Sequence, residues 1–187
     1  MIYYISDLHI GHKNALVFDN RPFSTVDEME KAIITNWNKC VVQSDDVYIL
    51  GDIFYRYGGS RTKFLSKLCG RIHLIIGNHD GALLSDESAM SRFESVSAIC
   101  DIEDNGRAVA LCHYPIADWN MKYHGGYHVY GHVHSAINNS TIFMQQLPRA
   151  YNAGCMINNY TPATLDELAY NNRIFREKKN IQGGGAE

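Results

Sequence analysis

Short apolar runs that end in polar clusters recur along the first half of the chain. They occupy residues 2–5, 47–50 and 72–76, and each is rich in β-branched or aromatic residues. Serine, glycine or aspartate follows every run, and these residues favour turns. Runs of this length and composition, bounded in this way, predict buried strands.

Helical spacing characterises the segments between these runs. Apolar residues recur with a helical period from Met29 to Cys40, and Thr25 and Glu28 form the pattern of a capping box before them. We therefore expect a helix over about residues 26–41. A second helix is expected around Phe64, Leu65 and Leu68. Strands that alternate with helices in this way indicate an α/β fold.

The second half of the chain opens with a hairpin signal. Asn105-Gly106 separates two β-like runs at 96–102 and 108–111, and this dipeptide suits a tight turn whose residues both have positive φ. Two further elements are expected, a short strand at 129–130 and a C-terminal helix that opens on a capping box at 164–167 and frays over 177–179.

Length and composition narrow the class of protein. A chain of 187 residues suits one domain, which we expect over residues 1–180, with a disordered tail at 181–187. The net charge of −3 gives no basic excess, which argues against long nucleic acid as a partner.

No apolar run approaches the ~20 residues of a membrane-spanning helix, and no signal peptide is evident. Five widely spaced cysteines without a Cys-x-x-Cys pair indicate reduced thiols, so we expect a soluble cytoplasmic protein.

Polar clusters directly after the predicted strands carry the candidate chemistry. The five clusters are Asp7-Leu8-His9, Gly51-Asp52, Gly77-Asn78-His79-Asp80, His113 in Cys112-His113-Tyr114-Pro115, and Gly131-His132-Val133-His134. Carboxylates, imidazoles and an amide oxygen, without thiolates, suit borderline divalent metals such as manganese, iron, zinc or nickel. The candidate ligands are too many for one tetrahedral ion, whereas two ions about 3.5–4 Å apart that share a carboxylate would use them all. The missing thiolates also argue against a structural zinc module.

These clusters, in this order, resemble those of the calcineurin-like metallophosphoesterase superfamily, and the likeness spans about residues 1–160. The resemblance is strongest to small bacterial and phage phosphoesterases. It implies a four-layer α/β/β/α sandwich of two mixed sheets, with metals at the carboxyl ends of the strands. Carried over by motif, one metal is held by Asp7, His9 and His134. The resemblance assigns the other metal to Asn78, His113 and His132, and it makes Asp52 the ligand that bridges the two.

The resemblance also implies a mechanism. Two cations lower the pKa of a shared water, so that hydroxide attacks phosphorus near neutral pH. His79 is expected to protonate the leaving group, and Asp80 to orient and stabilise its imidazolium. In one respect the chain departs from the family, because many relatives have a second aspartate where this chain has Tyr55.

Several other residues have two interpretations each. Arg21 and Arg56 are candidate substrate binders, since arginine suits phosphate, but a structural ion pair is at least as good an explanation. His12, His124 and His128 are expected to be loop residues, with a supporting role near the site as the alternative. His73 is expected to be a half-buried histidine within a strand.

The expected function is hydrolysis of a small phosphate ester, such as a small nucleotide or a cyclic phosphodiester. The expected cofactors are two divalent or trivalent ions (manganese, iron, zinc or nickel), with manganese the first choice for assays in vitro. The sequence leaves open whether the ester is a monoester or a diester, and it does not set the oligomeric state. Two alternatives are a nuclease acting on short nucleic-acid ends and a non-catalytic scaffold on the same fold.

Overall fold

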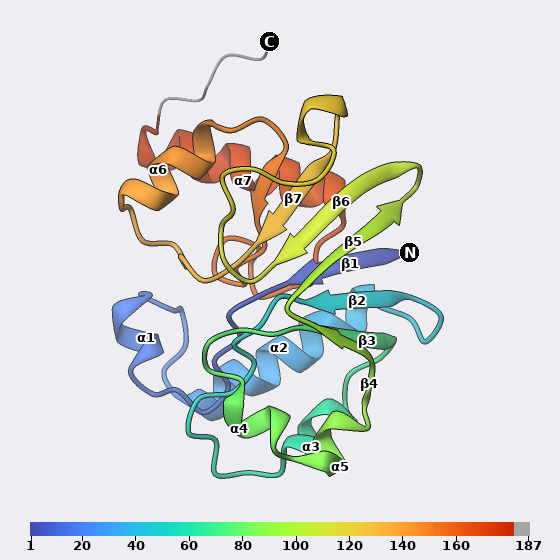
Figure 1. Cartoon of the computed structure of the whole chain (residues 1–187). Helices are drawn as coiled ribbons and strands as arrows, with labels where there is room; N and C mark the ends of the chain where they lie inside the picture. Colours follow the sequence, from blue (N-terminus) through green and yellow to red (C-terminus); the bar gives the residue numbers. More distant parts are fainter. Residues whose placement is uncertain (182–187) are drawn as a thin grey trace.

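The computed structural model describes residues 1–181, so the predicted tail at 181–187 lies outside the described residues except for Ile181. Two four-stranded sheets form the centre of the protein (Figure 1). Within residues 1–181, no helix is both long enough and apolar enough to cross a membrane.

The first sheet is parallel throughout. Its strands lie side by side in chain order: β1 (Ile2–Ile5), β2 (Asp46–Ile49), β3 (Arg71–Ile75) and β4 (Phe93–Ser97). The expectation of two mixed sheets is wrong for this one. Helical crossovers join its successive strands, and such a crossover returns the chain to the same end of the sheet before the next strand begins.

The second sheet is mixed. It contains β5 (Ile99–Asp104), β6 (Arg107–Cys112), β7 (Tyr127–Tyr130) and β8 (Ala150–Asn152), in that order. β5 and β6 form an antiparallel hairpin, whereas β6, β7 and β8 are parallel. Only Ala98 separates β4 from β5, so the chain passes directly from one sheet into the other.

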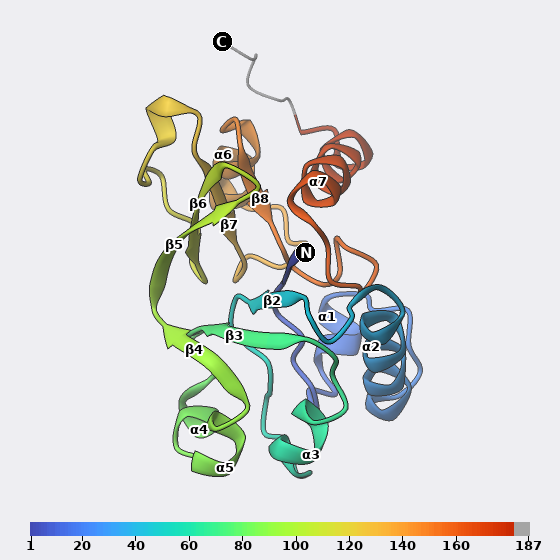
Figure 2. The ribbon, with the colours of Figure 1, turned by 90° about the vertical axis from the view of Figure 1, so that its right-hand side faces the viewer.

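Helices cover the outer faces of both sheets, which gives the four layers implied by the resemblance (Figure 2). The longest helices are α2 (Val26–Cys40) and α7 (Leu165–Lys179). The shorter ones are α1 (Ala15–Phe18), α3 (Arg61–Leu65), α4 (Gly81–Leu84), α5 (Glu87–Met90), the 3₁₀ helix η1 (Lys122–His124) and α6 (Asn139–Gln146). α2 and α3 pack on the first sheet, and α6 packs on the second.

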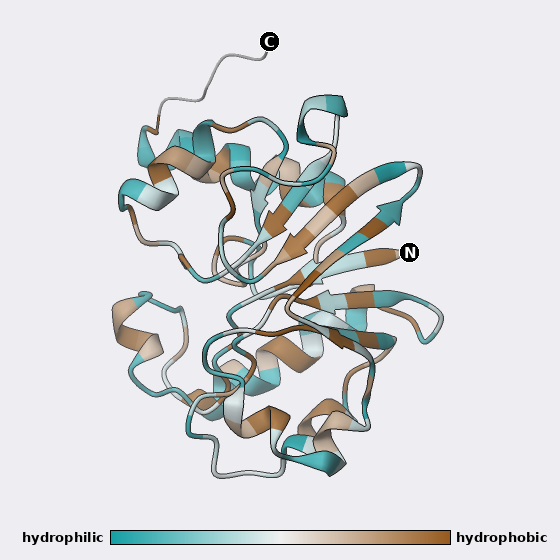
Figure 3. Cartoon of the chain, in the orientation of Figure 1, coloured by the Kyte–Doolittle hydropathy of each residue, from teal (hydrophilic) through white to brown (hydrophobic). Residues whose placement is uncertain are grey.

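Successive residues of a strand pack into different hydrophobic cores, one between the sheets and one beneath the helices. Tyr3 of β1 packs in the core beneath α2, whereas Tyr4 lies in the core between the two sheets. In β6, Leu111 faces the core between the sheets and Ala110 faces α6. This two-residue period, with apolar residues on both faces, is what a sheet buried on both sides requires. The central strands are accordingly largely hydrophobic (Figure 3).

The strands and helices with strong local signals occur close to their expected positions. β1 matches its expected bounds, while β2, β3 and α2 shift by about one residue. The Thr25 side chain caps α2, and a full capping box opens α7, which continues to Lys179 rather than fraying over 177–179. Asn105 (φ 52°) and Gly106 (φ 77°) form the hairpin turn between β5 and β6, as predicted.

Other elements differ from the expectation. The predicted run 96–102 is divided between β4 and β5, and therefore between two sheets. α3 ends at Leu65, so Leu68 lies beyond it although it remains in the same core. No sequence signal indicated α1, α4, α5, α6 or β8, which are all short.

Candidate metal centre

The loops that follow five strands meet at the carboxyl ends of the two sheets. They carry every metal ligand that the resemblance implied: Asp7 and His9 after β1, Asp52 after β2, Asn78 after β3, His113 after β6, and His132 and His134 after β7. Two overlapping groups of their side chains, Asp7–His9–His134 and Asp7–Asp52–His113, each place their ligand atoms within 4.8 Å of one another. The structure thus brings together residues as distant in the chain as His9 and His134, which are 125 positions apart.

Unusual backbone conformations recur in these loops. Asp7, His9, Asp52, His132 and His134 all have positive φ, between 50° and 70°. A left-handed conformation costs a residue with a side chain roughly 1–2 kcal/mol. Such strain persists where the surrounding structure enforces it, and it is concentrated at functional sites. These side chains are therefore held in place at an energetic cost to the fold.

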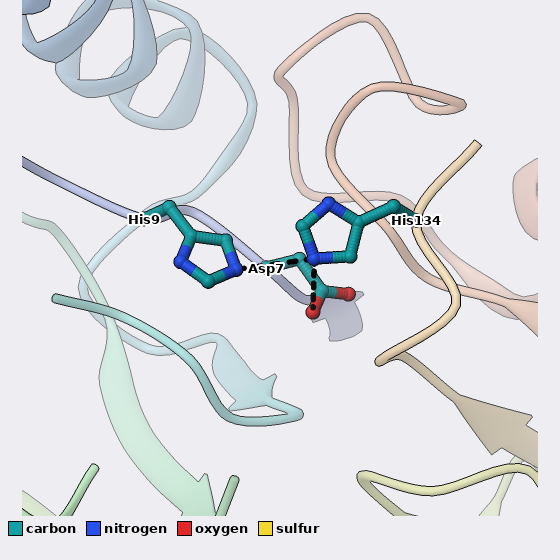
Figure 4. A group of neighbouring side chains, drawn as sticks. All are labelled: Asp7, His9 and His134. Carbon is teal, nitrogen blue, oxygen red and sulfur yellow. Dashed lines mark hydrogen bonds and ion pairs between the residues drawn. The ribbon is translucent and has the colours of Figure 1, made fainter. Parts of the chain in front are cut away.

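The side chains of the first group, Asp7, His9 and His134, point toward one another (Figure 4). The Nε2 atoms of His9 and His134 are 3.1 Å apart, and the Nε2 atom of His134 is 3.6 Å from Oδ1 of Asp7. Asp7 and His9 are buried, whereas the side chain of His134 is 16% exposed. Asp7 is fixed further, because its carboxylate accepts the backbone N–H of His132 and contacts the hydroxyl of Ser6.

Beside the first group lie the donors that the resemblance assigned to the other metal, and from here on these are called the second group: Asn78, His113 and His132. Oδ1 of Asn78 is 3.0 Å from Nε2 of His113 and 3.0 Å from Nδ1 of His132. The Oδ2 atom of Asp52 is 3.5 Å from Nε2 of His113 and 3.7 Å from Nε2 of His9. Asp52 therefore lies between the two groups, while the backbone N–H of His79 holds its other oxygen.

Two of the candidate ligands, His113 and His134, form hydrogen bonds through Nδ1, which leaves Nε2 free to bind a metal ion. Nδ1 of His113 lies 2.7 Å from the carbonyl oxygen of Leu50, to which it donates as the N–H tautomer. Nδ1 of His134 lies 2.9 Å from Oδ2 of Asp19, a residue to which the sequence analysis assigned no role. In both rings the partner of Nδ1 leaves Nε2 with its lone pair directed at the candidate site, as expected for metal-binding histidines.

Burial controls the protonation of this cluster. It lowers the pKa of His9 to about 2, with nearby His134 acting in the same direction, so the imidazole is neutral at pH 7. It raises the pKa of Asp7, although His134 opposes this effect. For His134, burial lowers the pKa, but the bond to Asp19 together with the negative charges of Asp7 and Asp19 outweighs burial, and the pKa is raised.

The residues present fit metal ions. Ligands about 2.0–2.1 Å from one tetrahedral ion lie roughly 3.3 Å apart, close to the separations within both groups. Two aspartates, an amide oxygen and imidazoles without thiolates are the donors that suit borderline divalent metals. The members converge from five loops, and buried carboxylates and imidazoles gathered without a cation would be costly.

Asp80 makes contacts other than the one that the resemblance implied. The structure records no hydrogen bond between the side chains of His79 and Asp80, both within the described residues. Instead the fully buried carboxylate of Asp80 accepts the backbone N–H groups of Asp52, Ile53 and Gly77, at 2.8–3.2 Å. It therefore joins the loop after β2 to the loop after β3. His79 is exposed, and the role that the resemblance gave to Asp80 stays a prediction.

Glycine is required where these loops touch. A Cβ atom on Gly77 would overlap the side chain of Asp52, and one on Gly131 would overlap that of Ser6. Neither glycine has positive φ, so close approach, rather than turn geometry, requires glycine here. The motifs thus pack directly against one another.

A cavity of about 650 Å³ opens beside the first group of donors. Its lining includes four histidines of the motifs, His9, His79, His132 and His134, and also His12, Phe18, Asn20, Asn138, Ser140 and Lys179. His12 lies in a loop, as expected, and it stacks on Tyr55 with ring centroids 3.7 Å apart. The edge of Tyr55 also meets His79, at 5.1 Å between centroids.

The two candidate arginines differ. The Arg21 side chain is fully buried and bonds to Asp19 and to the backbone carbonyls of Asp7 and Leu8, so the geometry favours an ion pair over contact with substrate. Arg56 is exposed and lines a second cavity of about 370 Å³, together with Asn78 and His79. No ion pair involving Arg56 occurs within residues 1–181.

Three histidines that the sequence analysis also considered are His73, His124 and His128. His128 is not in a loop as expected: it lies buried within β7, between the backbone groups of Ala110 and Ile116. His73 is half-buried in β3 and bonds to Ser95 and Asp46, as expected. His124 is exposed in η1.

Comparison with known proteins gives a consistent result. The family model described as calcineurin-like phosphoesterase matches residues 1–102. An uncharacterized protein of Methanocaldococcus jannaschii is 34% identical over 167 residues, covering 88% of this chain and 87% of that protein. The gene 66 protein of Mycobacterium phage L5 is 30% identical over 162 residues, covering 71% and 77% of the two chains. A solved structure, a protein of unknown function from Aquifex aeolicus, has a TM-score of 0.72 and 25% identity, and covers 91% of this chain and 98% of that chain.

Proposed function

Because the chain belongs to the calcineurin-like phosphoesterase family, we propose that it hydrolyses a small phosphate ester at a centre that binds two metal ions. The observation that carries the proposal is the position of the Asp52 carboxylate between His9, on the side of the first donors, and His113, on the side of the second. As in the sequence analysis, one ion is assigned to Asp7, His9 and His134, and the other to Asn78, His113 and His132. Asp52 is assigned to both. Residues 1–180 would act as one domain.

The metal ions, when bound, supply Lewis acidity that activates water and offsets the charge growing on the phosphoryl oxygens. Any of manganese, iron, zinc or nickel suits the donor set, and manganese is the first to test. The protein's own part is to hold the ligands in place through the Asp80 bonds and the glycine contacts described above.

His79 is the proposed general acid. It is exposed to the cavity, follows Asn78 directly, and is held near the donors by its backbone bond to Asp52. None of its ring nitrogens is engaged with a carboxylate in the described chain, so the ring is free to donate a proton to a leaving-group oxygen. Tyr55 and His9 pack against its ring and restrict its orientation.

The cavity suits a small ester better than a polymer. Pockets for small molecules have volumes of roughly 300–1,000 Å³, and the cavity of about 650 Å³ lies within this range. Phe18 offers an aromatic face, while Asn20, Ser140 and Lys179 offer polar and cationic groups. These features favour a nucleotide or cyclic phosphodiester, and the net charge of −3 disfavours long nucleic acid.

The test is hydrolysis of bis-p-nitrophenyl phosphate and p-nitrophenyl phosphate by metal-free protein, before and after addition of Mn²⁺. We expect metal-dependent turnover of at least one ester, reduced by about 100-fold or more in His79→Gln while metal content stays at the wild-type value. Loss of metal in that variant would make His79 a ligand instead of an acid. Two bound ions without turnover of either ester would favour the non-catalytic scaffold.

A further inference from the structure

A carboxylate outside all five motifs contacts the candidate centre. Asp19 directly follows α1, and its side chain is only 4% exposed. Both of its oxygens lie within 3.0 Å of Nδ1 of His134, which is 115 residues away in the chain. A buried ionised group so close to a candidate ligand calls for a physical explanation, because burial without compensation is costly.

The charge of Asp19 is compensated on its other side. The Nε and Nη2 atoms of Arg21 lie 3.1 Å and 2.9 Å from its Oδ2 atom. Arg21 also donates to the carbonyl oxygens of Leu8, at 2.7 Å, and Asp7, at 3.0 Å. The arginine therefore fixes the position of Asp19 relative to the backbone of the first motif, which carries Asp7 and His9.

This arrangement constrains the imidazole of His134. A neutral imidazole has one N–H, and an ionised carboxylate beside Nδ1 accepts it there. Nε2 then has its lone pair directed at His9 and Asp7, at 3.1 Å and 3.6 Å. With the opposite tautomer, the proton would sit on Nε2 and block the position of a metal ion.

We propose that Asp19 is a positioning residue that holds His134 in its metal-binding tautomer and orientation, and that Arg21 holds Asp19. The inference rests on the proposed function, since His134 is taken as a metal ligand. It also extends the site to α1, whose Phe18 lines the cavity next to Asp19.

Metal affinity tests the proposal without reference to activity. Mn²⁺ binding to metal-free protein is measured by calorimetry for the wild type, Asp19→Asn and Asp19→Ala. The exposed Asp27, which makes no ion pair in the described chain, provides the matched control Asp27→Asn. We expect the affinity of one of two sites to fall roughly 10- to 100-fold in Asp19→Ala, to fall less in Asp19→Asn, whose remaining oxygen can accept the Nδ1 proton, and to stay unchanged in the control.

Nitrogen NMR of the histidine rings supplies a second readout in the absence of metal. The wild type should show His134 with its proton on Nδ1, and Asp19→Ala should shift the proton partly or wholly to Nε2. Since Asp19→Ala leaves the buried Arg21 unpaired and can impair folding, the double variant Asp19→Ala/Arg21→Met removes both charges together.

The possible outcomes distinguish failure of the Asp19 inference from failure of the proposed function. If the wild type binds two ions and the Asp19 variants bind both with wild-type affinity, Asp19 is only a structural ion-pair partner and the inference is wrong. If the wild type binds no divalent ion, the proposed function itself has failed. A lowered affinity at one site with an unchanged tautomer would overturn the tautomer mechanism.

Discussion

Removal of the Asp80 carboxylate should destabilise the fold even without metal. Its two oxygens accept three backbone N–H groups, those of Asp52, Ile53 and Gly77, and all of these groups are buried. A buried donor left without a partner costs about 1–3 kcal/mol. Asp80→Ala orphans three of them, and we expect a loss of about 3–9 kcal/mol. Since domains of this kind are stable by roughly 5–15 kcal/mol, that is a large fraction of the total.

The assay is urea denaturation in the presence of EDTA, so that loss of bound metal does not contribute to the difference. Asp80→Asn is the matched variant, because it keeps one acceptor oxygen and should lose only about 1–3 kcal/mol. The interpretation carried over from the family, with Asp80 as the partner of the His79 imidazolium, predicts something else. In that case both variants would retain their stability and lose turnover, and this result would refute the reasoning from the three amides.

Three further changes test individual elements. His128 lies buried in β7, and burial lowers its pKa to about 4 from 6.5. The unfolded chain therefore binds more protons between these values, so the wild type should lose up to about 3 kcal/mol as the pH falls from 6.5 to 4. Urea denaturation of His128→Gln should lack this slope, and an equal slope in both proteins would rule out His128 as its source. Tyr55→Asp should lose about 1 kcal/mol in thermal unfolding through loss of its stacking on His12, whereas Tyr55→Phe should match the wild type. Thr164→Ala should cost about 1 kcal/mol in urea by removing the capping box of α7, with Thr164→Ser near neutral; an unaltered midpoint for the alanine variant would contradict the capping account.

The features that the sequence predicted well are those specified by neighbouring residues. The capping residues Thr25 and Thr164 lie next to the helices that they begin, and the turn at Asn105-Gly106 needs only its own two conformations. The candidate ligands could be identified as a set because each follows a strand, and strand ends of parallel sheets meet at one edge. Short elements such as β8, with three residues, carry too few apolar positions for a periodic signal.

The features that could not be predicted from the sequence depend on tertiary contacts. Nothing local distinguishes Asp19 from a solvated loop residue, and its contact with His134 depends on how α1 folds back over the site. The contacts of Asp80 were missed for the same reason, because two of its partners are backbone amides from another loop. The run 96–102 looks like one strand, and only the packing of two sheets divides it at Ala98.

The most direct test of the central claim is the metal stoichiometry of the folded protein. Metal-free protein dialysed against Mn²⁺ is analysed by native mass spectrometry, with Asp52→Ala beside the wild type. We predict two ions per wild-type chain and a reduced occupancy of both positions in Asp52→Ala, since Asp52 lies between the two donor groups. A wild-type chain that binds one ion or none at saturating Mn²⁺, Zn²⁺ and Ni²⁺ would contradict the two-metal centre.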